Sequence, residues 1–201
     1  MAITLKPFRQ YDEHDVINMF AYDVDATATN GVVVTAGNLV KVTNGWKASD
    51  DIHDLTSTAP NAGGDLGLAG RALSLRYNLV AQVDSADGTA ANEPILGMLL
   101  HDVRTLDENG EQLKFNPRKA DEMQVVIPGQ AVPIVTKGIF LLHQAAADGS
   151  LDAVTTAGVP LYATSTGDWA DNSTTSGPVI GHSLGGWDAD SGTILVKLEL
   201  P

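Results

Sequence analysis

The chain contains no cysteine among its 201 residues, which excludes disulfide bonds and cysteine-ligated metals as sources of stability. Burial of apolar surface, hydrogen bonding and self-association must therefore hold the fold together. Long apolar runs are lacking too: residues 1–8 do not have the apolar stretch of a secretion signal, and no later run approaches the ~20 apolar residues that span a bilayer. We therefore expect a soluble protein that is made in the cytoplasm and has no membrane partner.

Basic side chains are scarce, with 12 lysines and arginines against 25 aspartates and glutamates, and the formal net charge is -13. The average field of such a protein repels phosphate backbones, so nucleic acid is not expected as its main partner. Acidic charge also favours solubility. Hydrophobic residues make up 43% of the chain, which is typical of a globular protein with a sizeable core in one large or two small domains.

Helical periodicity is nearly absent, and short β-branched or alternating runs separated by glycine-bearing turns take its place. Apolar and polar residues alternate most clearly over residues 73–84, which predicts a strand with one buried face. Only residues 116–123 indicate a helix, with Asn116 as N-cap and Pro117 at the first helical position. The sequence therefore predicts a mostly-β fold, a β-sandwich or β-barrel with one short helix. Further strands are expected at residues 95–104, 111–115, 124–127, 134–143, 159–163, 178–182 and 193–200, the first two of them paired as a hairpin.

The composition changes along the chain and divides it into four parts. Residues 31–34 and 39–42 are β-branched runs separated by Ala36, Gly37 and Asn38, which predicts a β-hairpin. The stretch that follows is rich in Asp, Ser, Thr, Pro and Gly without periodicity, and a loop of that length is usually functional or ordered by another chain. The four expected parts are an extended N-terminal arm (1–20) with a helical turn near 13–18, a β-hairpin region (21–47), a long loop (48–70) and a main β-domain (71–201).

The sequence GHSLGG at residues 181–186 matches the G-x-S-x-G nucleophile elbow and looks, letter for letter, like the version in lipases of the α/β-hydrolase family. An elbow serine must lie on a strand-to-helix turn, with an acid and then a histidine downstream to activate it. Ser183 is followed instead by turn residues at 187–192, by an alternating run at 193–200 and by no histidine. We predict a β-hairpin here and no catalytic residue, and a serine esterase using Ser183 is the alternative from a different functional class.

The sequence also gives little support for a metal site. Asp188, Asp190 and Glu199 have the outer spacing of a calcium loop, but the glycine falls at the fifth loop position rather than the sixth, and the loop would run through a strand. The five histidines show no zinc-binding spacing. The acidic cluster at residues 50–54 is interpreted as solvated, with a cation or a basic partner as the alternative. We predict no metal and no cofactor.

Both ends of the chain resemble virion proteins of tailed phages, cyanophages especially. Residues 5–21, LKPFRQYDEHDVINMFA, look like the N-terminal segment of small virion proteins, and residues 179–200 are similar to the final hairpin of phage head decoration proteins. In those proteins a V-I-G-x-x-L strand turns at a D-x-D-G-like loop into a last apolar strand. The resemblance implies a capsid decoration (cement) protein, commonly a homotrimer, that binds the outer capsid surface of the virion and bridges subunits of the major capsid protein. It implies no active-site residue, so the chain is not expected to be an enzyme.

A decoration protein would need anchor side chains and segments that a partner orders. The arm (1–20) and the long loop (48–70) are the candidates for partner-ordered segments. The interface candidates are the aromatic residues Phe8, Tyr11, Phe20 and Trp46. Another structural part of a phage, such as a tail, neck or fibre-base protein, is the alternative within the same class.

Overall fold

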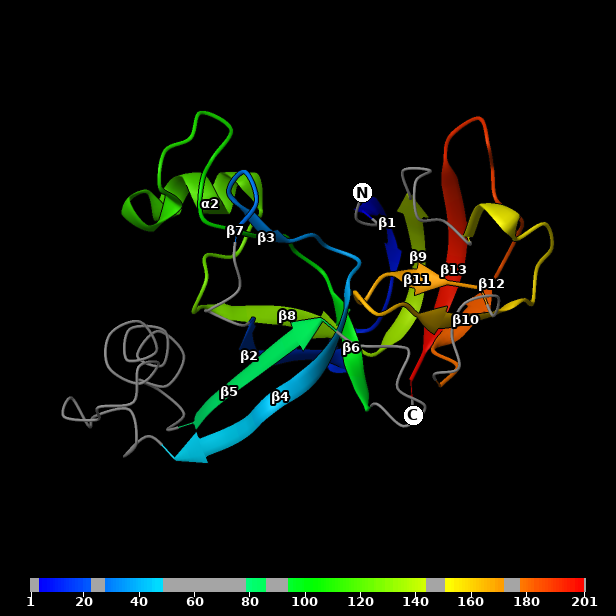
Figure 1. Ribbon diagram of the computed structural model, residues 1–201, viewed down its shortest axis with the longest axis horizontal. Coiled ribbons are helices and arrows are strands. Elements are labelled where there is room, and N and C mark those ends of the chain that lie inside the picture. Colours follow the sequence, from blue (N-terminus) through cyan, green and yellow to red (C-terminus); the bar gives the residue numbers. More distant parts are fainter. Residues whose placement is uncertain are drawn as a thin grey trace.

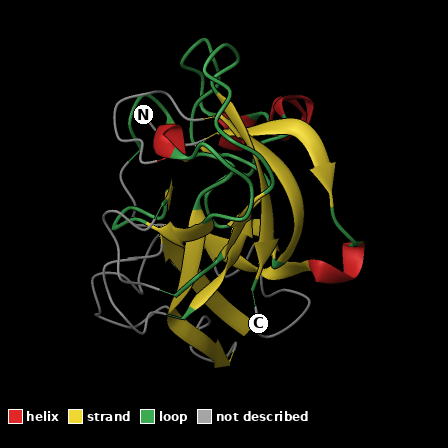
Figure 2. Cartoon of the chain, turned by 90° about the vertical axis from the view of Figure 1, so that its right-hand side faces the viewer, coloured by secondary structure: helices red, strands yellow, loops and turns green. Residues whose placement is uncertain are grey.

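The computed structural model describes residues 4–22, 28–48, 79–85, 94–143, 151–171 and 178–200. Strands dominate these residues and the helical segments are short (Figure 2). The prediction of a mostly-β fold with one short α-helix is therefore confirmed. The elements are β1 (Thr4–Gln10), η1 (Glu13–Asp15), β2 (Val16–Tyr22), β3 (Val32–Val34), β4 (Leu39–Ala48), β5 (Leu79–Ser85), β6 (Ile95–Leu99), β7 (Val103–Arg104), η3 (Leu113–Phe115), α2 (Pro117–Met123), β8 (Ala131–Val135), β9 (Lys137–His143), η4 (Leu151–Ala153), β10 (Pro160–Ala163), β11 (Trp169–Ala170), β12 (Gly181–Ser183) and β13 (Thr193–Glu199).

The strands form two large groups and one small pair. A six-stranded sheet has the order β1-β9-β13-β12-β10-β11, and its neighbours are all antiparallel. The pairings β2-β5-β4-β6-β8 close into a five-stranded ring, in which only β2 and β5 run parallel. In Figure 1 the ring lies to the left of the six-stranded sheet, and the small β3–β7 pair lies beside α2.

The N-terminal residues are extended, as expected, and they pair within the chain. β1 is an edge strand of the six-stranded sheet beside β9, and its Leu5 N–H donates to the Ala36 carbonyl at 3.1 Å. η1 forms one helical turn, after which β2 enters the five-stranded ring. Residues 4–22 therefore connect the two large groups of strands.

The predicted helix is confirmed as α2. The Asn116 side chain accepts a hydrogen bond from the Lys119 N–H, and Pro117 occupies the first turn, where its missing N–H costs nothing. The helix ends at Gln124, which has a left-handed backbone conformation and donates its N–H to the carbonyls of Ala120 and Asp121. These local signals are sufficient to define the segment.

The hairpin predicted between residues 31–34 and 39–42 is wrong, although both runs are strands. β3 pairs with β7, whereas β4 pairs with β5 and β6. The intervening turn is held by a third segment, because the Ala36 N–H donates to the Asp102 carboxylate at 2.8 Å and the Gly37 N–H donates to the Leu99 carbonyl at 2.8 Å. The turn therefore directs its two strands apart.

A tighter turn lies just before it. Asn30 and Gly31 have φ values of 52° and 80°, and Thr29 and Val32 exchange two backbone hydrogen bonds of 2.8 and 3.0 Å across them. Positive φ at both central residues is the geometry that Asn-Gly favours in two-residue turns. The Asn-Gly pair at residues 30–31 is therefore a turn signal in the sequence that precedes the turn predicted at residues 36–38.

Several strand predictions need correction in number, length or type. Residues 95–104 contain two strands, β6 and β7, residues 134–143 are divided between β8 and β9, and the strand predicted at 178–182 begins only at Gly181 as β12. The predicted hairpin of residues 95–104 with 111–115 keeps its turn and a single bridge between Leu106 and Gln112, but its second arm becomes η3. Residues 124–127 contribute one bridge, from Val126 to Val103, and no named strand. The alternation over residues 73–84 is described only from Leu79, where β5 begins; the rest lies outside the described residues.

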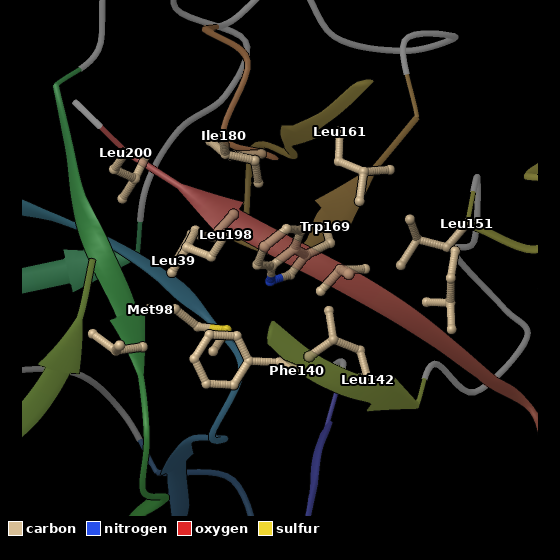
Figure 3. Close-up of a cluster of buried hydrophobic side chains, with 14 of the residues drawn as sticks. Leu39, Met98, Phe140, Leu142, Leu151, Leu161, Trp169, Ile180, Leu198 and Leu200 are labelled. Carbon is tan, nitrogen blue, oxygen red and sulfur yellow. The ribbon is translucent and has the colours of Figure 1, made fainter. Parts of the chain in front are cut away.

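Buried side chains form two clusters. The larger one lies on the inner face of the six-stranded sheet, where strands from both groups contribute side chains (Figure 3). The Trp169 indole N–H donates to the Gly37 carbonyl at 2.9 Å, so the largest buried side chain in this cluster has its polar group hydrogen-bonded. The smaller cluster joins side chains of the ring strands to the β3–β7 pair and contains Tyr22, Val34, Val40, Leu99, Val103, Val132 and Ile134.

A polar network joins the two groups of strands. Asn38 is 4% exposed and its amide donates to the Thr166 carbonyl at 2.9 Å. The Ser85 hydroxyl donates to the Asn38 side-chain oxygen at 2.9 Å and lies 2.8 Å from the Tyr22 hydroxyl. Burial raises the pKa of Tyr22 to about 12. Because a buried network is stable only when each member is paired, this one fixes how the ring meets the β10–β11 loop.

Candidate interaction surfaces

β1 contains a bulge that presents an aromatic side chain. Leu5 pairs with Leu142 and Arg9 with Phe140, so four residue steps in β1 match two in β9. Pro7 lies inside this bulge, where its missing N–H removes no ladder hydrogen bond. The next residue, Phe8, is 51% exposed.

The bulge is held from inside the molecule by Arg9. Its guanidinium Nη1 donates to the Leu100 carbonyl at 3.2 Å, and its Nε lies 3.5 Å from the Lys6 carbonyl, within the bulge itself. The side chain of Arg9 therefore fixes the backbone on both sides of Phe8. An exposed ring on a fixed backbone loses little conformational entropy when a partner covers it.

Tyr11 lies directly after the end of β1. Its ring stacks on Phe140 with a centroid distance of 5.9 Å and an interplanar angle of 24°, yet 40% of the residue is exposed. A shallow hollow beside it is lined by Gln10, Tyr11, Asp12 and Ile139. We call Phe8 together with these four residues the β1 surface.

The other two interface candidates lie elsewhere. Phe20 is half-buried in β2 and packs against the smaller hydrophobic cluster. Trp46 belongs to β4, where its backbone pairs with Ala81, and its side chain lies outside the described residues. Two of the four candidates, Phe8 and Tyr11, are therefore exposed in β1 or directly after it.

Ser183 is a buried structural residue with 1% exposure. Its hydroxyl donates to the Thr156 carbonyl at 2.9 Å and accepts from the Val159 N–H at 3.1 Å. β12 continues through a turn into β13, with Gly181 opposite Leu198, so the predicted β-hairpin is confirmed. The hydroxyl therefore ties the loop before β10 to β12, with both backbone partners satisfied.

The acidic residues with calcium-like spacing have separate local roles. The Asp188 carboxylate accepts from the Ser191 hydroxyl at 2.6 Å and from the Asp190 N–H at 3.1 Å, and these hydrogen bonds lower its pKa. Glu199 pairs with Lys197 at 2.8 Å at the other end of β13. Within the described ranges no three potential metal ligands are grouped, and the acidic cluster at residues 50–54 lies outside those ranges.

Sequence reasoning missed the outer face of the six-stranded sheet. Ile139 and Leu141 on β9 and Leu195 on β13 are partly exposed and Leu184 after β12 is exposed, while Phe140, Leu142, Ile194 and Val196 on the same two strands are buried. The signal was the unbroken apolar run at residues 139–142, because a strand that is apolar on both faces usually has both faces covered.

Comparison with protein-family models, with curated proteins and with solved structures gives no match to this chain. None of the helices in the described part of the chain has the length and apolar character needed to cross a membrane. Function must therefore be inferred from the chain's own surfaces.

Proposed function

We propose that this chain is a non-enzymatic structural protein of a tailed-phage virion, a capsid decoration protein that binds the outer surface of the shell and has the major capsid protein as its partner. One observation carries the proposal. The segment that resembles phage virion proteins, residues 5–21, also presents the exposed Phe8 ring on a braced bulge, with the partly exposed Tyr11 three residues further along the chain.

The energetics of such a surface suit a protein that stabilises an assembly. Covering the exposed half of Phe8 contributes roughly 1 kcal/mol, since full burial of such a side chain contributes about 1.5–3 kcal/mol. One contact of this size is weak. Many copies on one lattice, each bound to assembled and not to free subunits, stabilise the shell by mass action, and contact with several subunits at once raises the affinity further.

The direct test is co-sedimentation of the purified protein with empty shells of the phage that encodes it. Wild-type protein should pellet with shells, and Phe8→Asp should reduce the bound fraction at least tenfold because it puts a charge into the contact. Phe115→Asp is the matched control, because Phe115 is 78% exposed but lies in η3, outside the β1 surface. Circular dichroism would verify that both variants fold.

Each result has a distinct meaning. Retention by isolated tails, necks or baseplates, with none by shells, would replace the decoration role with another virion role. Equal losses for Phe8→Asp and Phe115→Asp, or a loss for Phe115→Asp alone, would exclude the β1 surface as the contact. Failure to bind any virion component would refute the proposed function.

A further inference from the structure

Three asparagines in this chain are each followed directly by glycine, at residues 30–31, 44–45 and 109–110. In such a pair the backbone nitrogen of the glycine can attack the side-chain carbonyl carbon of the asparagine, because glycine has no side chain that obstructs the approach. The reaction requires the backbone to rotate until the two atoms meet. The surroundings of each pair therefore determine whether the reaction proceeds in the folded protein.

The pair at residues 109–110 is the least restrained of the three. Asn109 and Gly110 lie at the tip of the turn between β7 and η3, and both are exposed. A Cβ added to Gly110 would meet nothing within 4 Å. The Gly110 N–H donates to the Asp107 carbonyl at 3.2 Å, and the N–H groups of Asn109 and Glu111 donate to the Asp107 carboxylate at 2.8 Å. Rotation at this pair therefore disturbs hydrogen bonds within one turn, and water can replace them.

The pair at residues 30–31 is held by a distant segment. Gly31 is buried, and a Cβ added to it would overlap the Leu106 side chain. The Gly31 carbonyl accepts from the Thr105 N–H at 2.8 Å and from the Thr105 hydroxyl at 3.3 Å. Two backbone hydrogen bonds also cross the Asn30–Gly31 turn. Rotation here must break contacts that lie outside the turn itself.

The pair at residues 44–45 lies inside a strand. Its backbone is anchored to β5 on both sides, because Val42 pairs with Val83 and Trp46 pairs with Ala81. By contrast, the backbone hydrogen bonds described for residues 107–111 all lie within that turn. The fold therefore distinguishes three identical dipeptides by what must move before each can react.

We propose that Asn109 is a site of spontaneous modification, at which the chain converts its own asparagine into isoaspartate and aspartate. The Gly110 nitrogen bonds to the Asn109 Cγ, the bond from Cγ to Nδ2 breaks, and ammonia leaves with the proton of the Gly110 amide. Water then opens the resulting succinimide ring at one of its two carbonyl carbons. Attack at Cγ gives aspartate, and attack at the main-chain carbonyl carbon gives isoaspartate. Neither step requires an oxidant or a reductant.

The products change the turn locally. Each adds a negative charge beside Asp107 and Glu108, in a chain whose formal charge is already -13. Isoaspartate also adds one methylene to the main chain between Asp107 and Glu111, which exchange hydrogen bonds of 2.8 and 2.9 Å. We expect this turn to open and Glu108 to separate from Lys119, with which it pairs at 2.9 Å. An exposed ion pair contributes little stability, so the modified chain stays folded.

Peptide mapping of the purified protein after prolonged incubation tests the proposal. Trypsin cleaves after lysine and arginine, so the three pairs fall in separate peptides, residues 10–41, 42–47 and 105–114. The 105–114 peptide should gain the mass difference between an amide and an acid and separate into two products of equal mass. Its rate should exceed that of the other two pairs at least tenfold, because reaction there must break additional hydrogen bonds of the fold. Isoaspartate is the diagnostic product, since direct hydrolysis of the side-chain amide yields only aspartate.

Unfolding in guanidinium chloride is the control for the role of structure. The three pairs have the same two residues, so their rates in the unfolded chain should agree within a few-fold. In the folded protein, Asn109→Gln should abolish the reaction in the 105–114 peptide and leave the other two peptides unchanged. Equal rates at the three pairs in the folded protein, a faster reaction at Asn30 or Asn44, or aspartate without isoaspartate would overturn the proposal. The measurement uses the isolated protein, so none of these outcomes bears on shell binding through the β1 surface.

Discussion

Replacing Gly181 by alanine should destabilise the protein far more than replacing Gly185 by alanine, although both glycines belong to the GHSLGG motif. A Cβ on Gly181 would overlap the Lys197 carbonyl oxygen and lie 3.2 Å from the Leu198 Cα, both of them backbone atoms of β13. A Cβ on Gly185 would meet nothing within 4 Å. The two substitutions add the same methyl group to one motif, so the difference between them isolates the packing of β12 on β13.

The magnitude follows from what must move. Overpacking in a core costs about 1–3 kcal/mol when side chains can adjust. Here the obstacle is a backbone carbonyl within the β12–β13 ladder, so relief requires separation of the strands and loss of their hydrogen bonds. We expect a loss of about 3 kcal/mol or more for Gly181→Ala, against the ~5–15 kcal/mol typical of folded domains. Gly185→Ala should stay within about 0.5 kcal/mol of wild type.

Thermal unfolding followed by circular dichroism measures the difference. For a chain of this size each kcal/mol lowers the melting temperature by about 2–4 °C, so Gly181→Ala should melt roughly 6–12 °C below wild type. Urea unfolding provides an independent free energy for the same pair. Similar midpoints for the two variants would show that β12 and β13 do not approach as closely as described, and the packed-hairpin interpretation of the motif would fail.

Two further predictions concern buried hydroxyl groups. Burial raises the pKa of Tyr22 to about 12 from 10.0, so the folded state keeps the phenol proton at pH values where the unfolded state has released it. The free energy of unfolding is therefore unaffected by this group below pH 10. It declines between pH 10 and 12 by roughly 1.4 kcal/mol per pH unit. Urea unfolding at pH 9 and pH 11 should show this decline in wild type and a smaller one in Tyr22→Phe, and equal declines would contradict the assignment to Tyr22. Ser183→Ala should cost about 1–3 kcal/mol, because it leaves the Thr156 carbonyl and the Val159 N–H without their partner, and a fluorophosphonate probe should not label the wild type. Stoichiometric labelling that disappears in Ser183→Ala would instead support the hydrolase alternative.

Elements specified by neighbouring residues were predictable from the sequence. Asn116 and Pro117 define the start of α2 through contacts within one turn. The C-terminal hairpin followed from turn residues at 187–192 and an alternating run after them, which also distinguished it from a catalytic elbow. In both cases the residues that decide the structure lie within a few positions of one another.

Pairings that depend on distant residues were not predictable. β3 pairs with β7 because the turn after it hydrogen-bonds to Asp102, which lies 66 positions from Ala36 in the chain. Likewise, Arg9 braces the β1 bulge through the Leu100 carbonyl, 91 positions away. A local pattern shows that Pro7 and Phe8 interrupt a strand, but it does not show which group holds the interruption open.

The run Ile139, Phe140, Leu141 and Leu142 shows the limit of a local pattern. Its unbroken apolar character is typical of a strand covered on both faces. Phe140 and Leu142 are buried in the core, while Ile139 and Leu141 keep part of their surface exposed. The run therefore predicted a strand without showing which of its faces packs the core. That choice depends on distant residues, because β9 pairs with β13 and places Phe140 opposite the buried Val196 and Leu141 opposite the partly exposed Leu195.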